Sequence, residues 1–447
     1  MLAVLTELEH LAAAPLWPGF DPGRIPVAVT DGTRTLLARH PRPPDGFVRV
    51  ALAGRDDVYR FAGRHPALRA STAVDLGGVL TATLLLDAVR PRPVREIAAG
   101  AVHEAFHVYQ RERHPAWAAN EAELFTYPVD DPVLLQLRRL ETTALRRALA
   151  AAERALAAWW AAAALALRRE RFDRLPAGAV AYERGSERNE GLARYVEWRA
   201  LRWRQGKHGE HGAQDVSRAI LPVGEFPAEA VRLRCYAVGQ ALALLLDRLA
   251  PQWAEHLEAG DTRSLDEVLE AAIAGPAGDT SRPVSPFSDR ERAVALSRAE
   301  AEVQQLLAVR VAERQAFLAA PGWTVQVVAG EGAPLQPQGF DPMNVRRLGP
   351  GEVLHTRWIK LGNAWGTVEV LGRRALTEAA GAHPLFTGVH ALTVTGIEEA
   401  PTVHEANEPN GTSAIRTGDV SAEFRHADVH RDRAHQYLRL DLGSSRP

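Results

Sequence analysis

Short runs that favour β-strands follow a brief N-terminal helical stretch in the first 92 residues. Two of them, Ile25–Thr30 and Thr35–Ala38, flank Asp31-Gly32, a pair typical of tight hairpin turns. A third run, Val79–Leu86, ends shortly before two prolines. We therefore expect residues 1–92 to form a mixed region built around a sheet.

Apolar positions recur with helical spacing between residues 93 and 320. Pro93 suits the start of a helix that runs to about Arg113. Pro132 opens a long segment rich in Leu, Arg and Ala, which we expect to continue as one helix to about Arg171. Further helices are expected at about 183–203, 227–249, 266–273 and 289–318.

The pattern changes at Pro321, where Gly and Pro become frequent and short alternating runs appear. Such runs are typical of antiparallel strands in a small sandwich or barrel. The prediction for the chain is an α+β fold in three parts. They are an N-terminal sheet part (1–92), a large helical domain (93–320) and an all-β domain (321–447).

Composition narrows the function classes. The chain has 447 residues and a formal net charge of −2, so it lacks the basic surplus typical of nucleic-acid binders. Its single cysteine, Cys235, excludes an intrachain disulfide and a four-cysteine zinc site. The longest apolar run, Ala155–Leu167, is shorter than the roughly 20 residues that span a bilayer. Glu7 and Glu9 interrupt the N-terminal apolar stretch, so we expect no signal peptide and a cytoplasmic location.

We expect a catalytic metal site at His103-Glu104-Ala105-Phe106-His107, on the helix that begins near Pro93. Residues four apart share a helix face, so His103 and His107 can present two imidazoles to one metal ion. Glu104 is placed to take a proton from a metal-bound water. This spacing predicts a catalytic zinc site.

A catalytic zinc usually has a third protein ligand, and Glu190 is the best candidate. It lies in the segment Asn189–Glu197, where the small residues Gly191 and Ala193 would let a second helix approach the first. On a regular helix Glu183, Glu187 and Glu190 share a face, so one of the other two could be the ligand or could orient a histidine. The competing ligands are Glu121, Glu123, Glu141, Glu183 and Glu187.

These pieces resemble the gluzincin metallopeptidases, in which two histidines and a glutamate bind zinc. The segment Asn189–Tyr195 is similar to the N-E-G-F-A-x-Y segment of alanyl-type aminopeptidases, whose glutamate is the third ligand. Tyr236-Ala237-Val238-Gly239 follows in the same order and is similar to their Y-E-K-G segment. The resemblance implies that Tyr236 stabilises the oxyanion, and we expect Arg234 to assist it.

Two departures limit the resemblance, which covers at most residues 75–250. A long interval that holds the 132–171 segment separates His107 from Glu190. The G-x-M-E-N segment that binds a substrate's amino end is missing, and Gly77–Ala82 stands in its approximate place. Aminopeptidase specificity is therefore not expected.

The expected function is zinc-dependent hydrolysis of a peptide bond in a peptide or protein substrate. The strand at Val79–Leu86 is expected to form the sheet edge above the site, where an extended peptide would pair. Two alternatives stay open: a non-catalytic binding protein on the same scaffold, and a zinc hydrolase of a non-peptide amide. Other histidines are not expected to bind metal, among them the pairs His208/His211 and His426/His430.

Overall fold

The structure is a computed structural model that describes residues 2–51, 56–87, 92–205, 213–222, 226–274, 286–341, 344–406 and 411–443. It shows an N-terminal sheet, a helical middle and a C-terminal all-β region, which confirms the predicted α+β class. The chain divides into two compact units. The first comprises Met1–Asn120 and Pro132–Ala299, and the second comprises Glu121–Asp131 and Glu300–Pro447.

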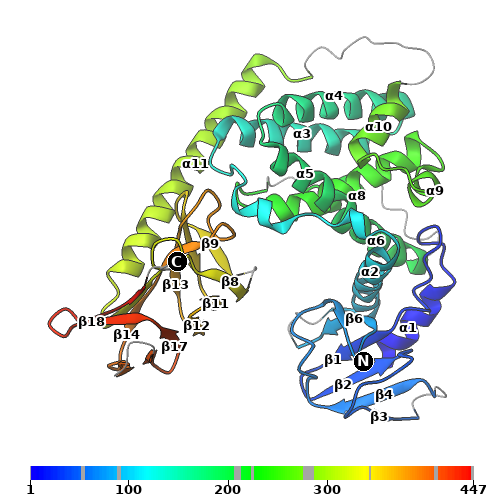
Figure 1. Cartoon of the computed structure of the whole chain (residues 1–447). Helices are drawn as coiled ribbons and strands as arrows, with labels where there is room; N and C mark the ends of the chain where they lie inside the picture. The colour runs from blue at the N-terminus through cyan, green and yellow to red at the C-terminus, as the bar shows by residue number, and fades with distance from the viewer. Residues whose placement is uncertain are drawn as a thin grey trace. The chain divides into compact units, whose positions relative to one another are not determined.

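The sheet of the first unit has six strands in the order β3-β4-β2-β1-β6-β5 (Figure 1). The predicted hairpin is confirmed, because β1 and β2 pair antiparallel around Asp31-Gly32 and Gly32 has a positive φ of 85°. The side chain of Asp31 accepts hydrogen bonds from the backbone of Thr33 and Arg34, which stabilises the turn. The strands are β1 (Val27–Thr30), β2 (Arg34–Ala38), β3 (Val48–Arg49), β4 (Val58–Ala62), β5 (Thr72–Asp75) and β6 (Leu80–Leu85).

The expected sheet edge is wrong. Strand β6 lies inside the sheet, parallel to β1 on one side and antiparallel to β5 on the other. It is buried along almost its whole length, including Thr81 and Thr83. The edge strands are β3 and β5, and β5 is the one next to β6.

Helices make up the rest of the first unit. Helix α2 contacts β5 and β6, and its buried apolar side chains join a core that also includes α1, α6 and α8 (Figure 1). The helices are α1 (Leu2–Ala12), α2 (Val94–Arg113), η1 (Pro115–Trp117), α3 (Pro132–Ala150), α4 (Arg154–Phe172), α5 (Ala177–Ser186), α6 (Leu192–Gln205), α7 (Ala213–Ile220), α8 (Val231–Leu249), α9 (Trp253–Glu258), α10 (Leu265–Ala274) and α11 (Asp289–Leu318), and a π-helical turn, η3 (Glu187–Gly191), joins α5 to α6. Helix α11 continues into the second unit.

The expected single helix from Pro132 to Arg171 is two helices, α3 and α4, which pack against each other. Arg248 stabilises the break between them, because its guanidinium donates to the Ala151 carbonyl (3.0 Å) just after α3 ends. The longest apolar run, Ala155–Leu167, lies in α4. Within the described residues, no helix combines the length and the apolar character that crossing a membrane requires.

The second unit holds two antiparallel-rich sheets whose inner side chains form one apolar core, as in a sandwich. Their strand orders are β18-β19-β7-β14-β13-β10-β9 and β15-β16-β17-β12-β11-β8. The short helix η2 (Glu121–Phe125) belongs to the same unit. The strands are β7 (Trp323–Val328), β8 (Gln336–Phe340), β9 (Val345–Arg347), β10 (Glu352–His355), β11 (Trp358–Asn363), β12 (Gly366–Leu371), β13 (Ala375–Ala379), β14 (Val389–Ile397), β15 (Thr402–His404), β16 (Thr412–Arg416), β17 (Val420–Arg425), β18 (Ala427–Asp432) and β19 (Tyr437–Leu442).

Candidate metal centre

The two histidines of the motif lie on α2, as expected. Buried Val102, Ala105 and Phe106 fix this helix against the core and leave His103 and His107 on one face, one turn apart. Both imidazoles are mostly buried, with 13% and 11% of their side-chain surface exposed. The packing of α2 therefore determines where both rings point.

Three donor atoms converge at this face. The Nε2 atoms of His103 and His107 are 3.1 Å apart, and Oε2 of Glu190 lies 3.2 Å from Nε2 of His107 and 3.8 Å from Nε2 of His103. Ligands at zinc distances in a tetrahedral arrangement are separated by about 3.3 Å. The triangle therefore fits a zinc ion. Among the described residues these three form the one group of at least three His, Cys, Asp or Glu that could hold a metal.

The π-helical turn η3 explains why Glu190, and not its neighbours, reaches the histidines. Hydrogen bonds in a π turn run from i to i+5, so an extra residue rotates later side chains relative to earlier ones. Glu183 and Glu187 consequently do not share a face with Glu190, contrary to expectation for a regular helix. Glu121 and Glu123 belong to the second unit and are not members of the cluster.

The other competing glutamates belong to a buried network of three carboxylates and three guanidinium groups, in which no side chain is more than 2% exposed. Arg168 donates twice to Glu187, with both distances 2.7 Å, and its Nη2 lies 2.8 Å from Glu141. Burial alone would raise the pKa of Glu141, but the arginines around it hold the pKa well below the usual range. The members are Glu141, Glu183, Glu187, Arg168, Arg171 and Arg234.

Each histidine is oriented from behind by a side chain that sequence reasoning did not assign. Nδ1 of His103 lies 3.2 Å from Oε2 of Glu197, and Nδ1 of His107 lies 2.9 Å from Oε1 of Gln110. Both contacts direct Nε2 toward the cluster, which is the usual arrangement around a metal-binding histidine. The signal was present in the spacing, because Gln110 follows His107 by three positions and Glu197 follows Glu190 by seven.

The carboxylates make the cluster attractive to positive charge. Burial lowers the pKa of His103, but hydrogen bonds with Glu190 and Glu197 outweigh it and raise the pKa to about 10. Burial would raise the pKa of Glu190, and its hydrogen bonds to the two histidines instead lower it. The negative charge of these carboxylates stabilises any positive charge at the imidazole pair, whether a proton or a metal ion.

Glu104 directly follows His103 on α2 and interacts electrostatically with both histidines. Burial raises the pKa of its carboxyl, and the nearby histidines partly oppose that rise. An elevated pKa suits a group that must accept and release a proton near neutral pH.

Tyr236 on α8 lies beside Glu190, and burial together with that carboxylate raises the pKa of its hydroxyl. The expectation that Arg234 assists it is wrong, because Arg234 is buried in the network and its Nη2 lies 2.9 Å from Glu141. The arginine that contacts Tyr236 is instead Arg232, which lies one helical turn before it on α8. Its Nε donates to the Tyr236 hydroxyl (3.3 Å), and its Nη2 lies 3.5 Å from Oε1 of Glu190.

One of the two small residues near Glu190, Gly191, acts differently from expectation. Gly191 lies against Gly239 of α8 and not against α2: a Cβ added at Gly191 would lie 2.5 Å from the Gly239 Cα. Helix α8 and the π turn therefore meet backbone to backbone. This contact gives a structural reason for the glycine that follows Tyr236 by three positions.

Gly239→Ala is expected to destabilise the first unit by about 1–3 kcal/mol through overpacking. The new Cβ would lie 2.3 Å from the Glu187 carbonyl oxygen, so α8 and the π turn must separate. Denaturant titration measures the loss. Gly100→Ala on α2, where nothing lies within 4 Å of an added Cβ, is the matched control and should be neutral or stabilising. Equal effects at both positions would contradict the close contact.

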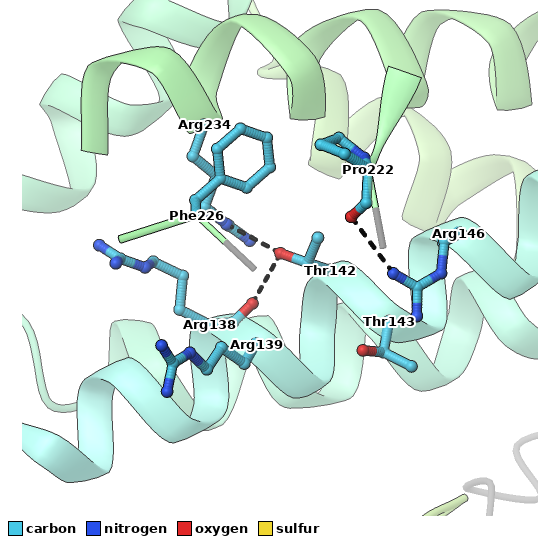
Figure 2. A pocket seen from close by; sticks show the side chains of 8 residues that line it. All are labelled: Arg138, Arg139, Thr142, Thr143, Arg146, Pro222, Phe226 and Arg234. Carbon is cyan, nitrogen blue, oxygen red and sulfur yellow. Dashed lines mark hydrogen bonds between the residues drawn. The ribbon is translucent and has the colours of Figure 1, made fainter. Parts of the chain in front are cut away.

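Figure 2 shows a cavity lined by side chains of α3, by the segment that precedes α8 and by Arg234 of α8, with no member of the cluster in its lining. Arg138, Arg139, Arg146 and Arg234 surround it, and Thr142 accepts a hydrogen bond from Arg234 Nε at 3.0 Å. Its volume of about 10 Å³ suffices for about one water molecule, so it does not hold a substrate as it stands.

The remaining histidine pairs give no further metal cluster within the part of the chain that the structure describes. His430 lies on the exposed strand β18, where its Nε2 is 3.2 Å from Asp441. His426 lies just before this strand and not on a helix. His208 and His211 lie outside the described residues.

Comparison with known proteins adds no family to this geometry. No protein-family model matches the chain, and searches of curated proteins and of solved structures found no match. The function is therefore inferred from the cluster itself.

Proposed function

We propose that the protein is a zinc-dependent metallohydrolase, and specifically a peptidase of the gluzincin type. The observation that carries the proposal is the triangle of His103, His107 and Glu190, whose donor atoms are spaced as a tetrahedral zinc requires. A purely structural zinc site would not need the adjacent carboxylate of Glu104. Its presence favours catalysis over binding alone.

Zinc held by these ligands would supply Lewis-acid chemistry that activates water and polarises a carbonyl. Glu104 accepts a proton from the attacking water and passes it to the leaving amine. The Tyr236 hydroxyl donates to the oxygen on which negative charge develops. Arg232 holds that hydroxyl in place. An extended peptide would add to the edge of the sheet at β5, the strand next to β6.

The proposal is tested by digesting a peptide library with the purified chain, before and after a chelator removes its metal. We expect cleavage that stops on chelation and returns when zinc is added. Chelator-sensitive hydrolysis of non-peptide amides without peptide cleavage would instead identify a different zinc hydrolase. A chain that binds zinc but cleaves neither substrate class would be a binding protein.

Tyr236→Phe is expected to lower kcat by about 10²- to 10³-fold with little change in KM, because the lost hydroxyl acts mainly on the developing oxyanion. Zinc content should not change, since Tyr236 is not a ligand. Steady-state kinetics on a cleaved peptide provide the measurement. Tyr59→Phe on β4 is the control and should behave as the native chain. A rise in KM at unchanged kcat would assign Tyr236 to substrate binding.

A further inference from the structure

The side chain of Gln110 lies between the two segments that carry the metal ligands. It is 1% exposed, and its Oε1 is 2.9 Å from Nδ1 of His107. Its Nε2 donates to the backbone carbonyl of Asn189 (2.9 Å) and lies 3.4 Å from that of Arg188. One amide therefore contacts the second histidine and the π turn that presents Glu190.

The contacts determine which way the amide faces and which tautomer His107 adopts. Backbone carbonyls only accept hydrogen bonds, so the NH₂ group of Gln110 must face Asn189 and Arg188. The amide oxygen then faces Nδ1 of His107, which must carry the proton to complete a hydrogen bond. The lone pair of Nε2 is left to face the cluster, as metal binding requires.

Contacts from neighbouring elements surround the π turn, a helical register that is rare in proteins. Gly239 of α8 and the bidentate pair of Glu187 with Arg168 hold two other sides of it. Gln110 joins the backbone of the turn to α2, the helix of the two histidines, beside the contacts that Glu190 makes with them. A displacement of the turn would move Glu190 relative to His107.

We propose that Gln110 is a positioning residue that couples the two arms of the metal site, fixing both the His107 tautomer and the place of Glu190. The proposal rests on the proposed metal site but concerns metal affinity, not turnover. An amide is suited to this role because it accepts at one end and donates at the other. Methionine fills similar space but does neither, and glutamate keeps only the acceptor.

Zinc affinity, measured by competition with a chromophoric chelator, tests the coupling. Gln110→Met is expected to bind zinc about 10- to 100-fold more weakly than the native chain. Gln110→Glu should also bind more weakly, because its carboxylate faces the Asn189 carbonyl without a donor. Gln136→Met on α3 is the matched control: Gln136 is also buried and donates to a backbone carbonyl, that of Arg292 at 2.6 Å. It should keep native zinc affinity.

The outcomes separate this inference from the proposed activity. Native zinc affinity in Gln110→Met would overturn the inference, whatever the activity. Native zinc affinity in Gln110→Glu would show that only the contact of Gln110 with the His107 imidazole matters. It would overturn the coupling to the π turn. An equal loss of zinc affinity in Gln136→Met would show that the loss in Gln110→Met comes from general destabilisation of the fold. The native chain could bind zinc, and the variants could show the predicted losses of affinity, without any cleavage of peptides. That outcome would support the role of Gln110 and contradict the proposed peptidase activity.

Discussion

Glu104→Gln is expected to lower kcat by about 10²- to 10⁴-fold, the usual contribution of a general base. The amide has almost the same shape as the carboxylate but cannot accept the proton from water. His103, His107 and Glu190 are unchanged, so zinc should bind with an affinity close to that of the native chain. Turnover of a cleaved peptide and zinc content, measured on the same preparation, check both halves of the prediction.

The matched control for Glu104→Gln is Glu96→Gln in the first turn of α2, where the carboxylate is on the same helix but not in the cluster. That variant should retain native kcat. Full activity of Glu104→Gln on a peptide that the native chain cleaves would show that another group takes the proton. Loss of zinc from the variant would show that Glu104 is needed for zinc binding, and the fall in kcat would then not identify it as the base.

Arg168→Leu is expected to destabilise the first unit by about 3–5 kcal/mol, because it leaves buried carboxylates without their main counter-charge. Arg168 is the bidentate partner of Glu187 and also contacts Glu141, and all three side chains are at most 2% exposed. Glu187 begins the π turn, so zinc affinity should fall together with stability. Denaturant titration and chelator competition measure the two effects.

Arg169→Leu provides the control, since the neighbouring Arg169 is 52% exposed and pairs with Glu270 at the surface. Exposed ion pairs contribute little, so its loss should change stability by less than about 1 kcal/mol. Similar losses for Arg168→Leu and Arg169→Leu would contradict the structural importance of the buried network. A stable Arg168→Leu variant that no longer binds zinc would point to a role confined to the metal site.

The part of the site that depends on local spacing could be predicted from the sequence. His103 and His107 share a face because helical geometry requires it, and Glu190 was found through the pattern that surrounds it. The hairpin at Asp31-Gly32 was predictable for the same reason, because turn chemistry acts over two to four residues.

The parts that depend on contacts distant in sequence could not be predicted in this way. Strand β6 pairs with both β1 and β5, which leaves β5 at one edge of the sheet, and no local pattern reports those pairings. The π turn separates Glu190 from Glu187, although a regular helix would place them on one face. On α8, the packing of the surrounding helices determines that Arg234 is buried and that Arg232 reaches the site.

The central claim is that His103, His107 and Glu190 together bind zinc. Elemental analysis of the purified native chain and of Glu190→Ala, after dialysis against a weak chelator, tests it most directly. We predict about one zinc ion per native chain and a large loss in the variant, because a catalytic zinc needs three protein ligands. A native chain without zinc, or a variant that retains as much zinc as the native chain, would contradict the account.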